Sequence, residues 1–116
     1  METYDVSLTP DAIADLASIY RFIVDESGYP EIAWNYIEKL REKCYLLERA
    51  PIRGHKRDDL RANLRILAID KNAVAAFEVD ESQLKVTILN IFYGGEDYET
   101  IMGDANERRE QALDGE

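Results

Sequence analysis

Apolar positions recur with two different periods in the first part of the chain, and these periods separate strands from helices. Between Tyr4 and Leu8 every second residue is apolar, which predicts a short half-buried strand. From Ile13 to Val24 apolar residues recur at spacings of three and four, which predicts an amphipathic helix. Thr9-Pro10 supplies a capping hydroxyl and a first-turn proline, and Ser27-Gly28 breaks the pattern, so this helix is expected to end at about Asp25.

A second amphipathic helix is predicted to begin at Pro30 and to end before Pro51, because the residue that precedes a proline disfavours the helical conformation. Its apolar stripe consists of Ala33, Ile37, Leu40, Cys44 and Leu47, widened by Ile32 and Tyr36. The short connection between the two helices predicts an antiparallel helical hairpin.

Three apolar runs rich in β-branched and aromatic residues follow, at Leu64 to Ile69, Ala73 to Val79 and Leu84 to Tyr93. Short polar turns separate them, so they are expected to pair as an antiparallel meander. Gly94-Gly95 ends the last run. Acidic residues after it suit a helix N-terminus, and Ile101 and Met102 are placed to pack back on the core.

The predicted fold class is therefore α+β. An N-terminal strand, a helical hairpin and a three-stranded antiparallel meander form one domain over residues 1–103, and the hairpin packs on one face of the sheet. The first strand must pair with the later three for the sheet to close over the helices. Residues 52–63 have no visible period and are expected to form a loop, and residues 104–116 form an acidic tail.

The charge distribution singles out the middle of the chain. The net charge is −10, which argues against direct DNA binding because phosphate contacts need Lys and Arg. Residues 49–65 nevertheless carry six basic and two acidic residues. The candidate contact residues there are Arg53, Lys56, Arg57, Arg61 and Arg65. Either this stretch binds an acidic partner, or it is an ordinary charged loop in which Asp58 and Asp59 are the internal partners.

The remaining residues of chemical interest predict packing more than chemistry. Cys44 falls on the second helical stripe and is expected to be a buried apolar residue. His55 is the only histidine and lacks a second metal-ligand residue, so neither a metal site nor a cofactor site is predicted. Trp34 lies just off the stripe and is the aromatic residue expected to make an exposed contact.

No apolar run is long enough to span a membrane, and the acidic N-terminus lacks the features of a signal peptide. We therefore expect a cytoplasmic protein without a membrane partner.

Four stretches of this sequence, in this order and spacing, resemble the RelE/ParE toxin superfamily over about residues 4–102. They are Leu8-Thr9-Pro10-Asp11-Ala12 with Asp15-Leu16, Pro30-Glu31-Ile32-Ala33, Arg53 to Leu60 with Leu64-Arg65, and Ile91 to Tyr98. The resemblance implies the toxin of a bacterial type II toxin–antitoxin module. It also implies a cognate antitoxin as partner, in a toxin–antitoxin hetero-oligomer.

Within this superfamily the toxins either cut mRNA on the ribosome, as RelE-like members do, or poison DNA gyrase, as ParE-like members do. Glu96 stands where the family usually has arginine, and a carboxylate there would repel a phosphate. Met102 stands where the nucleases usually have tyrosine. The resemblance therefore favours a ParE-like gyrase-binding toxin with no catalytic residues, and not an enzyme.

Two alternatives remain open from the sequence. The basic segment motivates a ribosome-dependent mRNA endonuclease, in which Tyr98 and Lys56 are conceivable as acid and base. The acidic balance and Glu96 motivate a degenerate member that retains only antitoxin binding.

Overall fold

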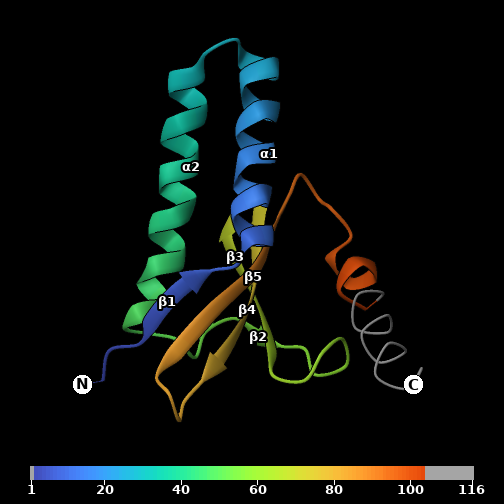
Figure 1. Ribbon diagram of the computed structural model, residues 1–116. Coiled ribbons are helices and arrows are strands. Elements are labelled where there is room, and N and C mark those ends of the chain that lie inside the picture. The colour runs from blue at the N-terminus through green and yellow to red at the C-terminus, as the bar shows by residue number, and fades with distance from the viewer. Residues whose placement is uncertain (1, 104–116) are drawn as a thin grey trace.

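A helical hairpin and a five-stranded sheet form the two layers of the molecule, for which a computed structural model describes residues 2–103 (Figure 1). The predicted acidic tail, residues 104–116, lies outside the described residues. The elements are β1 (Asp5–Leu8), α1 (Pro10–Ser27), α2 (Pro30–Tyr45), the 3₁₀ turn η1 (Leu46–Glu48), β2 (His55–Lys56), β3 (Leu64–Asp70), β4 (Ala73–Asp80) and β5 (Lys85–Tyr93). Residues 98–103 form a further short helical segment.

The sheet has the strand order β1-β5-β4-β3-β2. The meander β3-β4-β5 is antiparallel, and β1 joins it by parallel pairing with β5, so the predicted α+β architecture is confirmed. The prediction of a loop over residues 52–63 was wrong at His55–Lys56, which pair antiparallel with Ile66 and Arg65 as β2. Two residues are too few to reveal a period, because a strand pattern needs about four residues to be recognised.

Local sequence chemistry positions both ends of α1. The Thr9 hydroxyl oxygen accepts a hydrogen bond from the Ala12 amide at 3.1 Å, and the same hydroxyl donates to the Leu89 carbonyl of β5 at 2.8 Å. This N-cap therefore ties the start of the helix to the sheet. The helix runs to Ser27, two residues beyond the predicted end. It stops at Gly28, which has a φ of 77° and donates its amide to the Val24 carbonyl.

The second helix ends earlier than its apolar pattern predicts. Regular α-helix stops at Tyr45, and the chain tightens into η1 before Pro51. Leu47 remains fully buried in that 3₁₀ turn, so the apolar spacing continues although the helix type changes. Neither α1 nor any other helix within residues 2–103 is long and apolar enough to span a bilayer.

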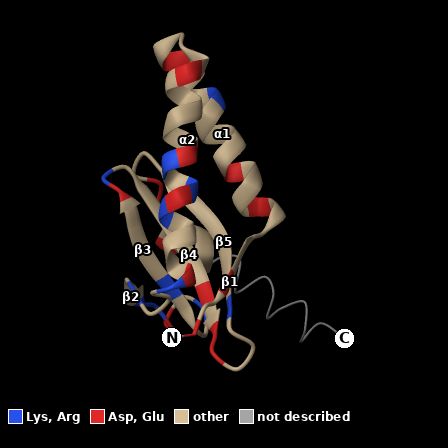
Figure 2. Cartoon of the chain, turned by 90° about the vertical axis from the view of Figure 1, so that its left-hand side faces the viewer, with Lys and Arg blue, Asp and Glu red and all other residues tan. Residues whose placement is uncertain are grey.

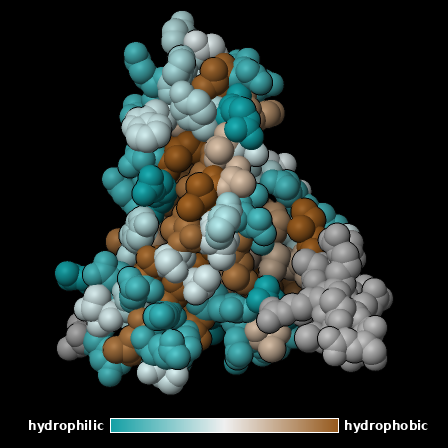
Figure 3. Space-filling view, in the orientation of Figure 1, coloured by the Kyte–Doolittle hydropathy of each residue, from teal (hydrophilic) through white to brown (hydrophobic). Residues whose placement is uncertain are grey.

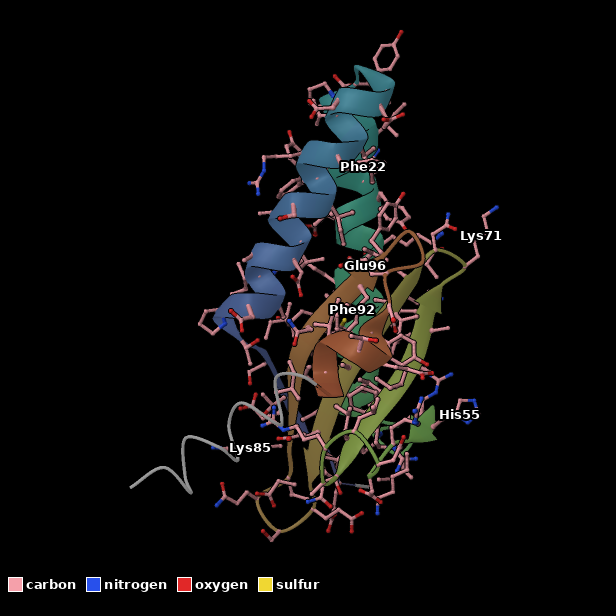
Figure 4. All side chains as sticks on the ribbon, turned by 90° about the vertical axis from the view of Figure 1, so that its right-hand side faces the viewer. Phe22, His55, Lys71, Lys85, Phe92 and Glu96 are labelled. Carbon is pink, nitrogen blue, oxygen red and sulfur yellow. The ribbon has the colours of Figure 1, made fainter. Side chains whose placement is uncertain are left out.

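Two apolar cores lie on opposite faces of the sheet. The larger core lies between the sheet and the helical hairpin and contains Leu16, Ile19, Leu40, Cys44, Phe77 and Ile88 among others. The smaller core contains Leu64, Ile66, Ala76, Phe92 and Met102, and the segment 98–103 covers it (Figure 4). Met102 is 3% exposed, as its expected packing requires, whereas Ile101 is 41% exposed and points outward.

Candidate functional site

The basic segment between Pro51 and Leu64 is tightly folded. Gly54 has a φ of 73°, and a Cβ at this position would overlap the Ile66 carbonyl. This close approach is what allows β2 to pair with β3 directly afterwards. After β2, the Arg57 amide donates to the Leu64 carbonyl at 2.8 Å, and the Asn63 amide donates to Asp58 Oδ1 at 2.8 Å. The long segment is therefore held by its own backbone and does not form an open loop.

Most of the basic side chains predicted as contact residues have internal carboxylate partners. Lys56 Nζ lies 3.6 Å from Asp58 Oδ2. Arg57 binds Asp59 through two nitrogens, at 2.9 Å and 2.8 Å, and Glu99 through a third at 3.2 Å. Arg61 Nε lies 2.9 Å from Glu78 Oε1. The alternative in which Asp58 and Asp59 are internal partners therefore describes the local geometry.

The remaining two predicted cations differ in their environments. Arg65 uses Nε to bind the Arg53 carbonyl at 3.0 Å, which further ties β3 to the basic segment. The Arg53 side chain makes no ion pair with any residue from 2 to 103.

The hydrogen bond from Arg57 holds the pKa of Asp59 below its usual range. Around β2, at the base of the sheet, charges of both signs therefore lie side by side (Figure 2).

Trp34 belongs to a different surface from the basic segment. It lies in the first half of α2, and the beginning of α2 is at the end of the hairpin far from β2 (Figure 1). The side chain is 55% exposed, as the sequence predicts. Its side chain borders a groove of about 800 Å³ between the two helices and β1. The structure thus divides the predicted contact residues into the basic segment and this groove.

The groove has an apolar floor and an apolar rim. Leu16 and Ile37 form buried parts of its floor, and Val6 and Leu8 contribute from β1. Ile13, Trp34 and Tyr45 form much of the rim, and Ile13 is 58% exposed. Figure 3 shows hydrophobic side chains gathered along the seam between the helices in the same region. An exposed apolar surface of this kind is typical of an interaction site.

Two further features of the groove restrict the partner. Arg21 and Arg41 contribute cations to its wall, although Arg21 also donates to the Ser18 hydroxyl and Arg41 lies 3.7 Å from Glu38. The strand β1 is the terminal strand of the sheet, so one of its edges has no neighbouring strand among residues 2–103. An amphipathic segment with apolar anchors and a carboxylate suits this chemistry, and an extended part of it can pair with β1.

The turn after β5, where Glu96 departs from the family pattern, has a structural role. Glu96 Oε1 accepts a hydrogen bond from the Tyr93 amide at 3.0 Å, which closes the turn. The Tyr98 ring packs on Phe92 with centroids 6.0 Å apart, and Met102 is buried in the smaller core. Lys56 is paired with Asp58. The residues considered for acid–base chemistry are therefore engaged in local packing and ion pairs.

Most of the groove is not predicted by the sequence pattern. The helical spacing places Ile13 on the apolar stripe of the first helix, and no motif points to Tyr45, Arg21 or Arg41. The sequence signal that could have revealed the groove is the width of the apolar surface on the two helices. Ile13 and Ile32 both belong to predicted stripes, yet both are more than half exposed, because one sheet face cannot cover so wide a surface on two helices.

Solved structures from toxin–antitoxin systems share this fold. A chain from the chromosomal ParDE toxin–antitoxin system of P. aeruginosa aligns with a TM-score of 0.67 and 26% identity over 78% of this chain and 96% of that chain. A chain of the RelBE2 toxin–antitoxin complex from Mycobacterium tuberculosis aligns with a TM-score of 0.54 and 19% identity, over 78% of this chain and 98% of that chain. A mutant of the E. coli toxin RelE in the free state aligns with a TM-score of 0.59 and 9% identity, over 90% of this chain and 97% of that chain.

The fold and these similarities define the class of protein: a toxin of the RelE/ParE superfamily from a type II toxin–antitoxin system. The particular family follows from a family model described as the ParE toxin of the type II toxin–antitoxin system parDE, which matches residues 6–98. The chain belongs to this ParE toxin family. Among curated proteins, none matches the sequence at a significant level.

Proposed function

We propose that this chain is a ParE-type toxin that binds DNA gyrase and traps it on DNA, and that it acts as a binding protein and not as an enzyme. The observation that carries the proposal is the ParE family match over residues 6–98. The turn after β5 supports it, because Glu96 stands where the resemblance implies an arginine, and the buried Met102 stands where the nucleases usually have tyrosine. Phosphoryl transfer needs positive charge around the scissile phosphate, which a carboxylate does not supply.

The basic segment is the proposed contact surface for the target. Arg53 is its strongest candidate, since its side chain makes no ion pair within the described part of the chain. Arg57 and Arg61 have partners in Asp59, Glu99 and Glu78, so a target carboxylate would have to compete with those contacts. Exposed ion pairs contribute little free energy, so a target carboxylate can replace these internal partners at a small cost.

The groove between the helices and β1 is the proposed site for the cognate antitoxin. Its apolar floor, its exposed rim and its two arginines suit an amphipathic acidic segment. The P. aeruginosa structure that shares the fold is itself a ParDE toxin–antitoxin system, which supports an antitoxin as the partner. An antitoxin seated there would be held mainly by burial of apolar surface, with the arginines fixing its register.

A plasmid cleavage assay tests the gyrase proposal. Purified gyrase is incubated with supercoiled plasmid, ATP and the toxin, and then denatured with detergent and protease. The expected result is linear plasmid that increases with toxin concentration and disappears when the antitoxin is added first. In cells without the antitoxin, the same mechanism produces growth arrest with a DNA-damage reporter switched on.

The competing functions give different results in the same experiments. The basic segment favours an mRNA endonuclease as the second candidate. That activity would arrest growth with the reporter off and with messages cut within codons. A member that only binds antitoxin would form the complex without arresting growth. Either outcome, together with plasmid that gyrase leaves uncleaved at micromolar toxin, would refute the gyrase proposal.

A further inference from the structure

A second cleft, of about 630 Å³, lies between α1, the turn that precedes β4 and the end of β5. Asp15, Ser18 and Phe22 line it from α1, and Tyr93 and Glu96 line it from the end of β5 and the turn that follows. Figure 4 shows Phe22 and Glu96 on the same side of the molecule. This cleft shares no lining residue with the groove proposed for the antitoxin.

Two carboxylates at this cleft are held in place from the β5 side. Asp15 Oδ2 accepts hydrogen bonds from the Ile91 amide at 2.8 Å and from Asn90 Nδ2 at 3.1 Å. Glu96 Oε1 accepts from the Tyr93 amide at 3.0 Å. Within residues 2–103, the second oxygen of each carboxylate has no hydrogen-bond donor and no ion-pair partner. Each group is thus oriented by one oxygen and can accept a ligand with the other.

An aromatic wall and an apolar floor stand beside these carboxylates. Phe22 is 51% exposed, and its ring meets that of Tyr93 edge to face with centroids 5.8 Å apart. Ile19 and Ile91 are buried beneath them and contribute to the lining. An exposed aromatic face beside an acceptor is the arrangement that binds a cation with an apolar stem.

No cationic side chain of the described residues lines this cleft. Lys71 is close in sequence to the lining residue Asn72, but in Figure 4 its side chain extends away from Glu96. Burial raises the pKa of Asp15, and the negative charges of Glu96 and Asp11 raise it further. A bound cation would reduce the cost of keeping Asp15 ionised in this position.

We propose that this cleft binds an arginine side chain from a partner protein. The planar guanidinium stacks on the exposed face of Phe22, and its N–H groups reach the unpaired oxygens of Asp15 and Glu96. Arginine suits the cleft better than lysine, because only a planar group both stacks on the ring and offers several donors in one plane. The antitoxin groove carries Arg21 and Arg41 instead, so the two clefts on either side of α1 select segments of opposite charge.

The test uses the full-length protein and two capped tripeptides, acetyl-Ala-Arg-Ala-amide and the same peptide with citrulline in place of arginine. Citrulline has nearly the same shape but no charge. Binding is followed by two-dimensional NMR of the ¹⁵N-labelled protein. The expected result is saturable shifts of the Ile91 and Tyr93 amides with the arginine peptide, because these amides bind the two carboxylates. The citrulline peptide is expected to leave both amides unchanged.

Matched variants separate the cleft from general acidity. F22A and E96Q should each weaken binding about threefold, since one loses the ring and the other the charge. Glutamine at position 96 can still accept from the Tyr93 amide, and Phe22 is exposed, so both variants should fold. I32A and E31Q remove an equally exposed apolar side chain and a carboxylate outside this cleft, and they should leave the affinity unchanged.

Three results would overturn the proposal. Equal shifts with arginine and citrulline would remove the charge from the explanation, and shifts spread over all acidic surfaces would show nonspecific attraction. Shifts of the same amides on diluting the protein without peptide would show that a second copy of the chain fills the cleft. None of these outcomes depends on gyrase, so the gyrase proposal stands or fails separately.

Discussion

The Tyr36 hydroxyl donates a hydrogen bond to Asp70 Oδ2 over 2.7 Å, and this bond joins the middle of α2 to the last residue of β3. Lys39 lies three residues further along α2, and its Nζ is 3.2 Å from Asp70 Oδ1. The two contacts hold the pKa of Asp70 below its usual range, with the Tyr36 hydrogen bond as the larger cause. Tyr36 also packs edge to face on Tyr93, so it connects the helix to two strands.

We expect Y36F to lower the free energy of unfolding by about 1 kcal/mol at neutral pH, because a charge-assisted hydrogen bond at a partly exposed site is lost. Because the native pKa of Asp70 is lowered, its ionised form stabilises the fold, and this stabilisation is fully present above the ordinary carboxyl pKa near 3.8. It is lost as pH falls through the lower native pKa. Urea denaturation of both proteins at several pH values measures this difference. A penalty that stays constant down to the acid limit would contradict the role given to Asp70.

The antitoxin proposal makes Trp34 a strong contributor to binding. Since a tryptophan at the rim of an apolar groove is often an energetic centre, W34A should weaken antitoxin binding about tenfold or more. I52A is the matched control, because Ile52 is also 55% exposed but does not line the groove. Titration calorimetry with the purified antitoxin gives both affinities. If W34A and I52A bind alike, the antitoxin uses another surface.

The sequence predicts the layers of this fold well because they depend on long periodic stretches. Two helical stripes and three strands have enough residues for the period to be clear, and their order leaves few ways to build a sheet. The two-residue strand β2 has no such signal. It exists because Gly54 lets the chain approach Ile66, a relationship between segments that no local pattern contains.

The candidate site was predicted less completely than the fold, for a related reason. The charges of the basic segment are visible in the sequence, but the partners of Arg57 and Arg61 at Glu99 and Glu78 are distant along the chain. The groove depends on which stripe residues the sheet leaves uncovered, and Ile13 is one of them. Glu96 reads as a departure from the family, whereas its side chain closes the turn after β5.

Glycine is required at position 54 for two reasons, and a comparison with Gly28 separates them. Both residues have positive φ, but a Cβ at Gly28 meets nothing within 4 Å, whereas one at Gly54 would overlap the Ile66 carbonyl. G28A should therefore cost about 1 kcal/mol, the cost of the left-handed conformation alone. G54A should cost clearly more, since β2 must separate from β3. Thermal or urea unfolding measures both, and equal costs would show that the backbone adjusts at Gly54 without strain.

The segment 98–103 should contribute to stability through Met102. M102A removes a side chain that is 3% exposed in the smaller core, so it should cost about 2 kcal/mol or more. The neighbouring Ile101 is 41% exposed, and I101A is expected to change the stability by no more than about 0.5 kcal/mol. Denaturant midpoints at unchanged slope give both values. A small effect of M102A would mean that this helical segment does not remain on the sheet in solution.

Asp15 provides a test of the electrostatics of the second cleft that needs no ligand. Burial is the main cause that raises its pKa, although the hydrogen bonds from Ile91 and Asn90 oppose this shift. The native protein therefore binds this proton more tightly than the unfolded chain does. The resulting stability is fully present below the ordinary pKa near 3.8 and is lost as pH rises through the raised native pKa.

The variant D15N lacks this titration but retains an oxygen that can accept from the Ile91 amide. Over the window between the ordinary and the raised pKa, the wild-type protein should lose stability relative to D15N as pH rises. Urea unfolding across that window measures the difference, and NMR of the Asp15 carboxyl carbon gives the native pKa directly. A carboxyl that titrates at or below its ordinary pKa would mean that its hydrogen bonds outweigh its burial. In that case Asp15 would be a stable anion on its own, and a bound cation would not be needed to offset the cost of ionising it.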